Sequence, residues 1–165
     1  MVQGQEGCFL AVVLLWSVRK GVLMGGVLRR GSGLRGPDGM ARGGGERSLR
    51  GLRSHHAGLA AEDRVAQAYD RGGMSVCARR WRGSAGEIDI VARDGARVIF
   101  IEVKQSRTHD EAASHLTPWQ MSRIRTAASE FLAGEPRGQL TEVRIDVALV
   151  DGYGRVEILE NACAA

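Results

Sequence analysis

Four charged residues lie within two runs that otherwise have the composition of buried β-strands, residues 86–92 and residues 98–104. They are Glu87 and Asp89 in the first run and Glu102 and Lys104 in the second. Isoleucine, valine and phenylalanine favour strands, whereas a charged group inside a sheet carries a desolvation cost unless a partner offsets it. A divalent metal ion and a phosphodiester are chemically suitable partners for such a set.

The dipeptide Asp94-Gly95 separates the two runs and is typical of a two-residue hairpin turn, which needs positive φ. With this pair as the turn, Glu87 lies opposite Glu102, and Asp89 lies diagonal to Glu102 at about 7 to 8 Å. Lys104 shares their face, because side chains alternate with a period of two. A three-residue loop would reverse the faces and separate the groups.

Two carboxylates at that spacing can hold one hard cation, and Mg²⁺ binds oxygen ligands together with waters and phosphate oxygens. We therefore predict that Asp89 and Glu102 bind Mg²⁺ or Mn²⁺, and that Lys104 stabilises charge at the phosphate or orients an attacking water. The alternative is an ion pair on a solvated face between Lys104 and Glu102 or Glu87. Three acids against one base leave surplus negative charge, which favours the metal interpretation. Glu87 either flanks the site or orients a water.

Length and charge limit the interpretation of the whole chain. Its 165 residues, 44% of them hydrophobic, suffice for one domain with a single core. The net charge of +4 is uneven, because residues 1–56 contain nine Lys and Arg against three Asp and Glu, whereas residues 57–165 contain 14 against 16. The basic total is therefore weak evidence for nucleic-acid binding.

The first 56 residues contain 13 of the 23 glycines and show no apolar periodicity after Met24. We expect disorder there and a folded domain over residues 57–165. The apolar run over residues 8–16 is too short to span a bilayer and lacks the preceding positive charge of a secretory signal. A start codon placed too far upstream, with Met40 or Met24 as the natural start, is the preferred explanation. A membrane-surface anchor is the competing one, and detection of residues 1–23 in the native protein would contradict the first.

The three cysteines, Cys8, Cys77 and Cys163, lie far apart in the chain. Their spacing matches no zinc motif and suggests no disulfide framework. We therefore expect a reducing cytoplasm as the location.

The hydrophobic periodicity predicts an ordered part that begins at Gly58. The expected elements are a helix over residues 59–71, strands over 74–82, 86–92 and 98–104, a polar loop over 106–115, a helix from Pro118 that Gly134 ends, and strands over 143–150 and 155–160. Thr117 and Gln120 have the spacing of a capping box at the start of the second helix. The order α-β-β-β-α-β-β predicts an α/β fold with a mixed central sheet flanked by helices.

Several charged side chains flank the expected site. Glu62 is an acid within the apolar stripe of the first helix, where spacing slightly favours a first-turn glutamate oriented to water over a fourth carboxylate directed at the sheet. Arg79, Arg80 and Arg82 of the first strand are suited to a phosphate backbone, although a solvated edge strand explains them nearly as well. Arg123 of the second helix is available to a phosphate or to water.

This constellation resembles the PD-(D/E)xK nuclease superfamily, with Asp89 as the motif aspartate and residues 102–104 as the E-x-K. More closely, residues 58–162 resemble the YraN family, small bacterial proteins that are similar to archaeal Holliday-junction resolvases. The match is carried by Gly58, Glu62, residues 86–89, residues 100–104, Ala127, Ala128, residues 144–147, Asn161 and Ala162. Ile88 stands where the superfamily label has proline, and Gln120 stands where lysine is frequent in the family.

The resemblance implies a restriction-endonuclease-like core and a site made of Glu62, Asp89, Glu102 and Lys104, with Glu62 as a further metal ligand or a residue that orients a ligand water. It implies a metal-dependent endonuclease that acts on DNA, on branched or single-stranded repair and recombination intermediates. Branched DNA needs two cuts, so we expect a homodimer, with a helicase or repair protein as a further partner and no membrane partner. The alternatives are a non-catalytic nucleic-acid-binding adaptor that retains the fold and a purely structural domain.

Overall fold

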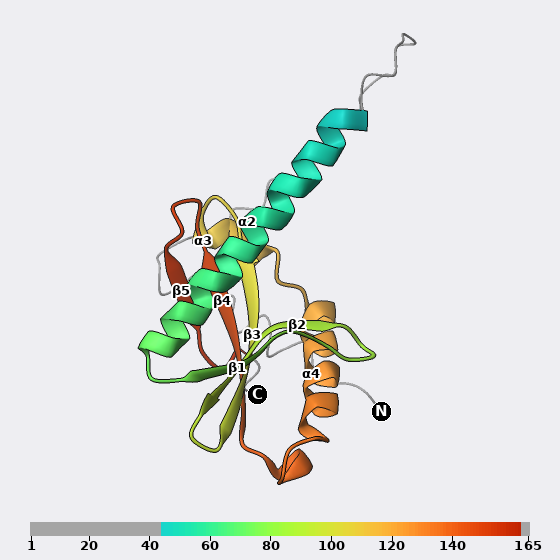
Figure 1. Ribbon diagram of the computed structural model, residues 1–165, viewed down its shortest axis with the longest axis vertical. Coiled ribbons are helices and arrows are strands. Elements are labelled where there is room, and N and C mark those ends of the chain that lie inside the picture. The colour runs from blue at the N-terminus through green and yellow to red at the C-terminus, as the bar shows by residue number, and fades with distance from the viewer. Residues whose placement is uncertain (1–43, 163–165) are drawn as a thin grey trace.

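The computed structural model describes the backbone of residues 44–162 and the side chains of residues 56–162, and it consists of one five-stranded sheet with helices on both faces (Figure 1). The elements are α2 (Gly44–Arg71), β1 (Ser75–Arg82), β2 (Glu87–Asp94), β3 (Arg97–Gln105), α3 (His109–Ser114), α4 (Pro118–Leu132), the 3₁₀ turn η1 (Gly138–Leu140), β4 (Val143–Val150) and β5 (Val156–Leu159). The strands lie in the order β1-β2-β3-β4-β5. β3 and β4 are parallel and the other neighbours antiparallel. The expected α/β fold with a mixed sheet is confirmed, and it is consistent with a restriction-endonuclease-like core.

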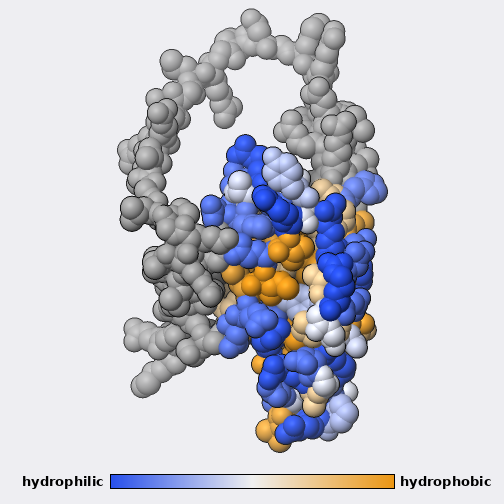
Figure 2. All heavy atoms as spheres, turned by 90° about the vertical axis from the view of Figure 1, so that its left-hand side faces the viewer, coloured by the Kyte–Doolittle hydropathy of each residue, from blue (hydrophilic) through white to orange (hydrophobic). Residues whose placement is uncertain are grey.

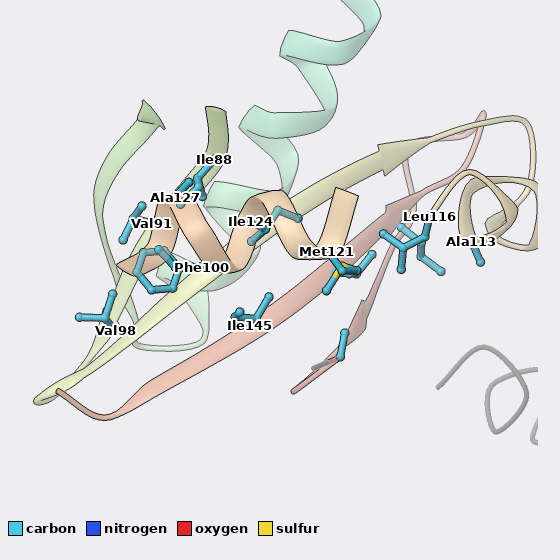
Figure 3. Close-up of a cluster of buried hydrophobic side chains, with 14 of the residues drawn as sticks. Ile88, Val91, Val98, Phe100, Ala113, Leu116, Met121, Ile124, Ala127 and Ile145 are labelled. Carbon is cyan, nitrogen blue, oxygen red and sulfur yellow. The ribbon is translucent and has the colours of Figure 1, made fainter. Parts of the chain in front are cut away.

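Each face of the sheet buries its own hydrophobic cluster. On one face, α2 packs Val65, Ala66 and Tyr69 against alternate residues of the central strands, among them Ile99 and Ile101. On the other face, α3 and α4 cover a second cluster, whose side chains point toward one another between helix and strands in Figure 3. The helices thereby fix the middle of the sheet from both sides.

The helix α2 begins earlier than the sequence predicted. It starts at Gly44 rather than Leu59, so residues 44–56 are helical where disorder was expected. Elongation of a helix that packing already stabilises adds one hydrogen bond per residue, which accounts for the longer helix. The expectations for residues 1–43, including the early start codon, the surface anchor and Cys8, lie outside the described residues, as does Cys163.

The turn of the β2–β3 hairpin differs from the predicted one by one residue. Asp94 pairs with Arg97, so Gly95 and Ala96 are the central residues. Gly95 has a φ of 58° and Ala96 is not among the residues with positive φ, as in a type II′ turn, which favours glycine at its first central position. The prediction placed Asp94 in the turn, where positive φ would have been required of it. Because the partner of each β2 residue moves by two positions, the shift does not exchange the two faces.

The hairpin β1–β2 is irregular beside the candidate site. Ile88 and Val91 are three residues apart, yet both belong to the cluster under α4, and their partners Trp81 and Ala78 also pack against it. A regular strand alternates with a period of two, so both strands must rotate between these positions. Arg80, with a φ of 49°, lies in the rotated segment of β1. The period-two alternation therefore fails locally, and it cannot be used to assign Asp89 of β2 to one face of the sheet.

The segment expected to be a polar loop contains the short helix α3. Thr108 caps it by accepting a hydrogen bond from the backbone N–H of Glu111. Ala112 and Ala113 are buried against the sheet, and these two small apolar residues among polar ones were a weak signal for a helix. The next helix, α4, begins at Pro118 with the predicted capping box.

The strand β5 forms the other edge of the sheet. It has four residues, all half-buried, and short edge strands limit pairing with other chains. Figure 2 views the side of the molecule that carries β5 and shows hydrophobic residues gathered at its middle within a polar surround. None of the helices in the described part of the chain has both the length and the apolar character needed to cross a membrane.

Candidate functional site

The two central acids lie where β2 and β3 stop pairing. The ladder ends at the pair Ile90 and Ile101, and the next residues on the two strands are Asp89 and Glu102. The Oδ2 atom of Asp89 accepts a hydrogen bond from the backbone N–H of Val103 at 2.7 Å. A side-chain carboxylate thus holds the two strands together beyond the end of their ladder.

The carboxyl group of Asp89 is strongly perturbed. Burial, followed by the negative charges of Glu102 and Glu62, raises its pKa to about 7, while the Val103 hydrogen bond and the charge of Lys104 oppose the rise. A carboxylic acid that titrates near neutral pH is typical of functional sites, although structural networks also produce such shifts. The shift means that Asp89 ionises about three pH units later than an ordinary aspartate, and that nearby positive charge would stabilise its carboxylate.

The lysine of the E-x-K pattern pairs with the glutamate of the same pattern. Lys104 donates from Nζ to Oε1 of Glu102 at 2.6 Å, and the side chains are 15% and 12% exposed. The ion pair of the alternative interpretation is therefore present, although it lies on a largely shielded face and not on a solvated one. It engages one of the acids and leaves the charge of Asp89 without a salt-bridge partner among residues 56–162.

The helix α2 brings Glu62 into the electrostatic environment of these acids. Its side chain is half-buried, and its charge is one of the influences that raise the pKa of Asp89. Burial raises the pKa of Glu62 itself, with Arg80 lowering it and Glu87 raising it further. Glu62 is therefore near the acidic site rather than directed fully into solvent.

The acids fit a hard divalent cation held by two protein ligands. Within residues 56–162, no three His, Cys, Asp or Glu side chains are gathered closely enough to hold one metal ion. Mg²⁺ nevertheless needs only one or two carboxylates, because waters and phosphate oxygens complete its coordination. Asp89 and Glu102 supply that number, and a cation would stabilise the ionised form of Asp89 that burial disfavours. The structure does not bring Glu62 to them as a third ligand, so its metal role stays a prediction.

Glu87 forms ion pairs with two arginines of β1. Its Oε1 accepts from Arg80 and its Oε2 accepts from Arg82, each at 2.7 Å. Arg79 forms an ion pair with Asp63 of α2. The three arginines of β1 that were predicted to bind nucleic acid are thus each paired with a carboxylate, although Arg82 remains 75% exposed.

Arg123 is the fourth residue that was predicted to bind nucleic acid, and it connects α4 to the loop between β1 and β2. Its Nε donates to the carbonyl oxygen of Ala85 at 2.6 Å. A Cβ atom added to Gly86, which has a φ of 152°, would lie 2.2 Å from the guanidinium. Glu130 holds the same loop by accepting from the backbone N–H of Ser84 at 2.7 Å. A side chain at residue 86 would therefore have a strained φ and would displace the Arg123 guanidinium, which favours glycine directly before the acids.

Trp119 was not among the predicted site residues, and it is 67% exposed on the first turn of α4. The sequence feature that could have indicated its exposure is its position outside the apolar stripe of α4, which includes Met121 and Ile124. The polar pair of β4, Arg144 and Asp146, supports the fold, because Asp146 is fully buried and ion-paired with Arg144 at 2.9 Å.

Comparison with known sequences gives a consistent family assignment. The profile described as Uncharacterised protein family UPF0102 matches residues 61–150. A UPF0102 protein of Cereibacter sphaeroides strain KD131 is 67% identical over 112 residues, which cover 68% of this chain and 96% of that protein. A UPF0102 protein of Ruegeria pomeroyi is 58% identical over 113 residues, covering 68% and 92% of the two chains. One of Dinoroseobacter shibae is 44% identical over 115 residues, covering 70% and 86%.

Proposed function

We propose that this chain, which belongs to the UPF0102 family, also known as the YraN family, is a metal-dependent endonuclease-like protein that hydrolyses phosphodiester bonds in DNA. The observation that carries the proposal is the half-buried carboxyl group of Asp89, with a pKa of about 7, beside Glu102 where β2 and β3 stop pairing. A divalent cation is the partner whose charge and oxygen preference suit this pair.

Each residue of the site has a distinct task in this proposal. Asp89 and Glu102 would hold a cation, which would neutralise charge on the phosphoryl oxygens and lower the pKa of a bound water. Lys104, already fixed by its ion pair with Glu102, would donate to a phosphate oxygen or orient the attacking water. Glu62 would accept a hydrogen bond from a water on the α2 side. Branched or single-stranded repair intermediates are the proposed substrates, with a symmetric dimer making paired cuts in branched DNA.

The second candidate is a nucleic-acid-binding adaptor that retains the fold without cleavage. The ion pair between Lys104 and Glu102 favours it, because a lysine engaged by a carboxylate is less available to a phosphate. The absence of a three-ligand metal cluster among residues 56–162 is also compatible with this alternative.

A cleavage panel tests the proposal. Purified protein is incubated at pH 8 with Mg²⁺ or Mn²⁺ and with labelled four-way junction, flap and single-stranded DNA. Wild type is expected to cut at least one substrate, and Asp89→Asn to reduce the rate to background because a cation ligand is lost. Asp94→Asn removes an exposed carboxylate from the turn end of the same strand, so it is the matched control and should cut at the wild-type rate.

Lys104→Ala separates the two candidates. An endonuclease should lose about 100- to 1,000-fold in cleavage rate, as expected when one group that stabilises transition-state charge is removed. An adaptor should bind DNA equally well with and without the lysine and should have no cleavage to lose. Failure of the wild type to cut any substrate with either metal, together with no detectable metal binding, would contradict the endonuclease proposal.

A further inference from the structure

An exposed tryptophan and an arginine form a stack on the first turns of α4. Trp119 is 67% exposed, although tryptophan is usually well buried. The guanidinium carbon of Arg123 lies 4.8 Å from the centre of its ring, within the range of a cation–π contact. The indole is thus held beside a positive charge while most of its surface remains open to solvent.

This stack is tied to the chain segment that leads into the candidate site. Arg123 donates to the carbonyl oxygen of Ala85 and lies against Gly86. Asp89 is three residues beyond Gly86 on β2. The indole–guanidinium stack and the acids are therefore connected through one short segment that α4 holds in place.

The charge of Arg123 distinguishes it from the other predicted DNA-binding residues. Arg79, Arg80 and Arg82 each form an ion pair with a carboxylate. Within residues 56–162, no Asp or Glu oxygen lies within 4.0 Å of the Arg123 guanidinium nitrogens. Its contacts are instead a neutral carbonyl and an aromatic ring, so its positive charge remains uncompensated by an acid there.

We propose that Trp119 is a stacking platform for an unpaired base of a nucleic-acid strand whose phosphate backbone passes from Arg123 to the acids. An aromatic face binds any base by stacking, and an arginine beside it binds the neighbouring phosphate. The inference rests on the proposed function and specifies its substrate class, a nucleic acid with at least one unpaired nucleotide near the attacked bond. A continuous duplex offers no base face to Trp119.

Equilibrium binding of short fluorescent DNA tests the role of Trp119. A 12-nucleotide thymidine strand, the same strand with abasic positions and a fully paired duplex are titrated with protein at pH 8 in Ca²⁺. Trp119→Ala is expected to weaken binding of the thymidine strand about 5- to 150-fold, the factor that corresponds to one stacked base. Trp119→Phe should restore most of the loss, because it keeps an aromatic face. Affinity for the abasic strand and for the duplex should change less than about twofold in either variant.

Leu140→Ala is the matched control, because Leu140 is another large hydrophobic residue that is 80% exposed and lies on η1. It should leave all three affinities unchanged, and thermal unfolding should show that no variant has lost its fold. Wild type that binds the strand with the same affinity as Trp119→Ala would overturn this inference and leave the endonuclease proposal standing. Wild type that binds none of the three DNA probes would overturn both.

Discussion

At the level of single residues, Asp89 is the carboxylic acid of the site whose pKa is raised to near neutrality. Its half-buried carboxyl group is partly desolvated, faces the charges of Glu102 and Glu62, and accepts a hydrogen bond from the backbone N–H of Val103. The desolvation and the two negative charges each disfavour the ionised form of Asp89. Such a carboxylate destabilises the fold when it ionises, and a bound cation would remove that effect.

The raised pKa of Asp89 predicts a specific dependence of stability on pH. Between the ordinary pKa of 3.8 and the native value of about 7, the native protein keeps a proton that the unfolded chain has released. The free energy of unfolding should therefore fall as the pH rises through this window, by on the order of 1 kcal/mol per pH unit. Asp89→Asn cannot ionise but still offers an oxygen to the Val103 N–H. In urea unfolding at pH 8 with a chelator, the variant should be more stable than wild type by on the order of 2 kcal/mol.

The exposed Asp94 provides the control for this measurement. Its side chain is 53% exposed and lies 3.5 Å from Arg97, so Asp94→Asn should change the free energy of unfolding by less than about 0.5 kcal/mol. If the Asp89 variant kept the wild-type slope of stability against pH, the titration of Asp89 would not be the cause of that slope.

At the level of elements, helix α4 fixes the approach to the site. It holds the loop over residues 83–86 through Arg123, which donates to Ala85, and through Glu130, which accepts from Ser84. The loop then enters β2 within three residues of Asp89. Because a donor and an acceptor on one helix hold two adjacent backbone positions of the loop, the strand that carries Asp89 starts from a defined backbone position.

Two glycines of the family-like pattern should respond to alanine in opposite directions. Gly86 has a φ of 152° and packs against Arg123, so Gly86→Ala should lower the free energy of unfolding by about 1 to 3 kcal/mol. Gly58 lies within α2 with nothing within 4 Å of an added Cβ, so Gly58→Ala should raise it by about 0.5 to 1 kcal/mol. Urea unfolding of both variants measures the two changes in the free energy of unfolding. Changes of the same sign would contradict the packing assigned to Gly86.

The elements themselves were largely predictable from local sequence. The capping box of Thr117 and Gln120 gave the start of α4, and the alternation of residues 143–150 gave β4 with its observed bounds. The turn at Gly95 was misplaced by one residue, because Asp-Gly and Gly-Ala pairs both fit two-residue turns and the sequence alone does not select between them.

The surroundings of the site were less predictable, because they depend on contacts between elements. No local pattern indicates that Glu87 pairs with both Arg80 and Arg82, or that Asp63 of α2 pairs with Arg79 of β1. The rotation of β1 and β2 beside the acids also arises from packing under α4. The sequence therefore identified the charged residues around the site, but it did not predict which of them form ion pairs with one another.

At the level of the whole molecule, one buried network joins the first helix, the sheet and the end of the described chain. Asp146 of β4 is fully buried, and its carboxylate accepts from Tyr69 of α2 at 2.7 Å and from the backbone N–H of Asn161 at 2.9 Å. Arg144 pairs with the same carboxylate. Burial and the nearby Asp146 raise the pKa of Tyr69, so its hydroxyl stays a donor in the working pH range. This network holds α2, and with it Glu62, against the sheet.

Removal of the network's centre should destabilise the entire fold. Asp146→Ala leaves the buried Tyr69 hydroxyl without its acceptor and the half-buried Arg144 with Glu160 as its remaining ion-pair partner, and should cost about 3 to 5 kcal/mol of unfolding free energy. Tyr69→Phe removes one hydrogen bond and keeps the ring in the core, so it should cost only about 1 to 2 kcal/mol. Chemical denaturation of both variants tests the order, and an Asp146 variant as stable as the Tyr69 variant would contradict the central role of Asp146.

The central claim is that Asp89 and Glu102 together hold a divalent cation, and Mn²⁺ titration followed by electron paramagnetic resonance tests it most directly. At pH 8, where most Asp89 is ionised, wild type should bind one Mn²⁺ per chain, and single-stranded DNA should strengthen the binding through its phosphate oxygens. Asp89→Asn and Glu102→Gln should each weaken binding at least about tenfold, while Asp94→Asn should bind as wild type does. Equal Mn²⁺ affinity in wild type and both site variants, with and without DNA, would contradict the account.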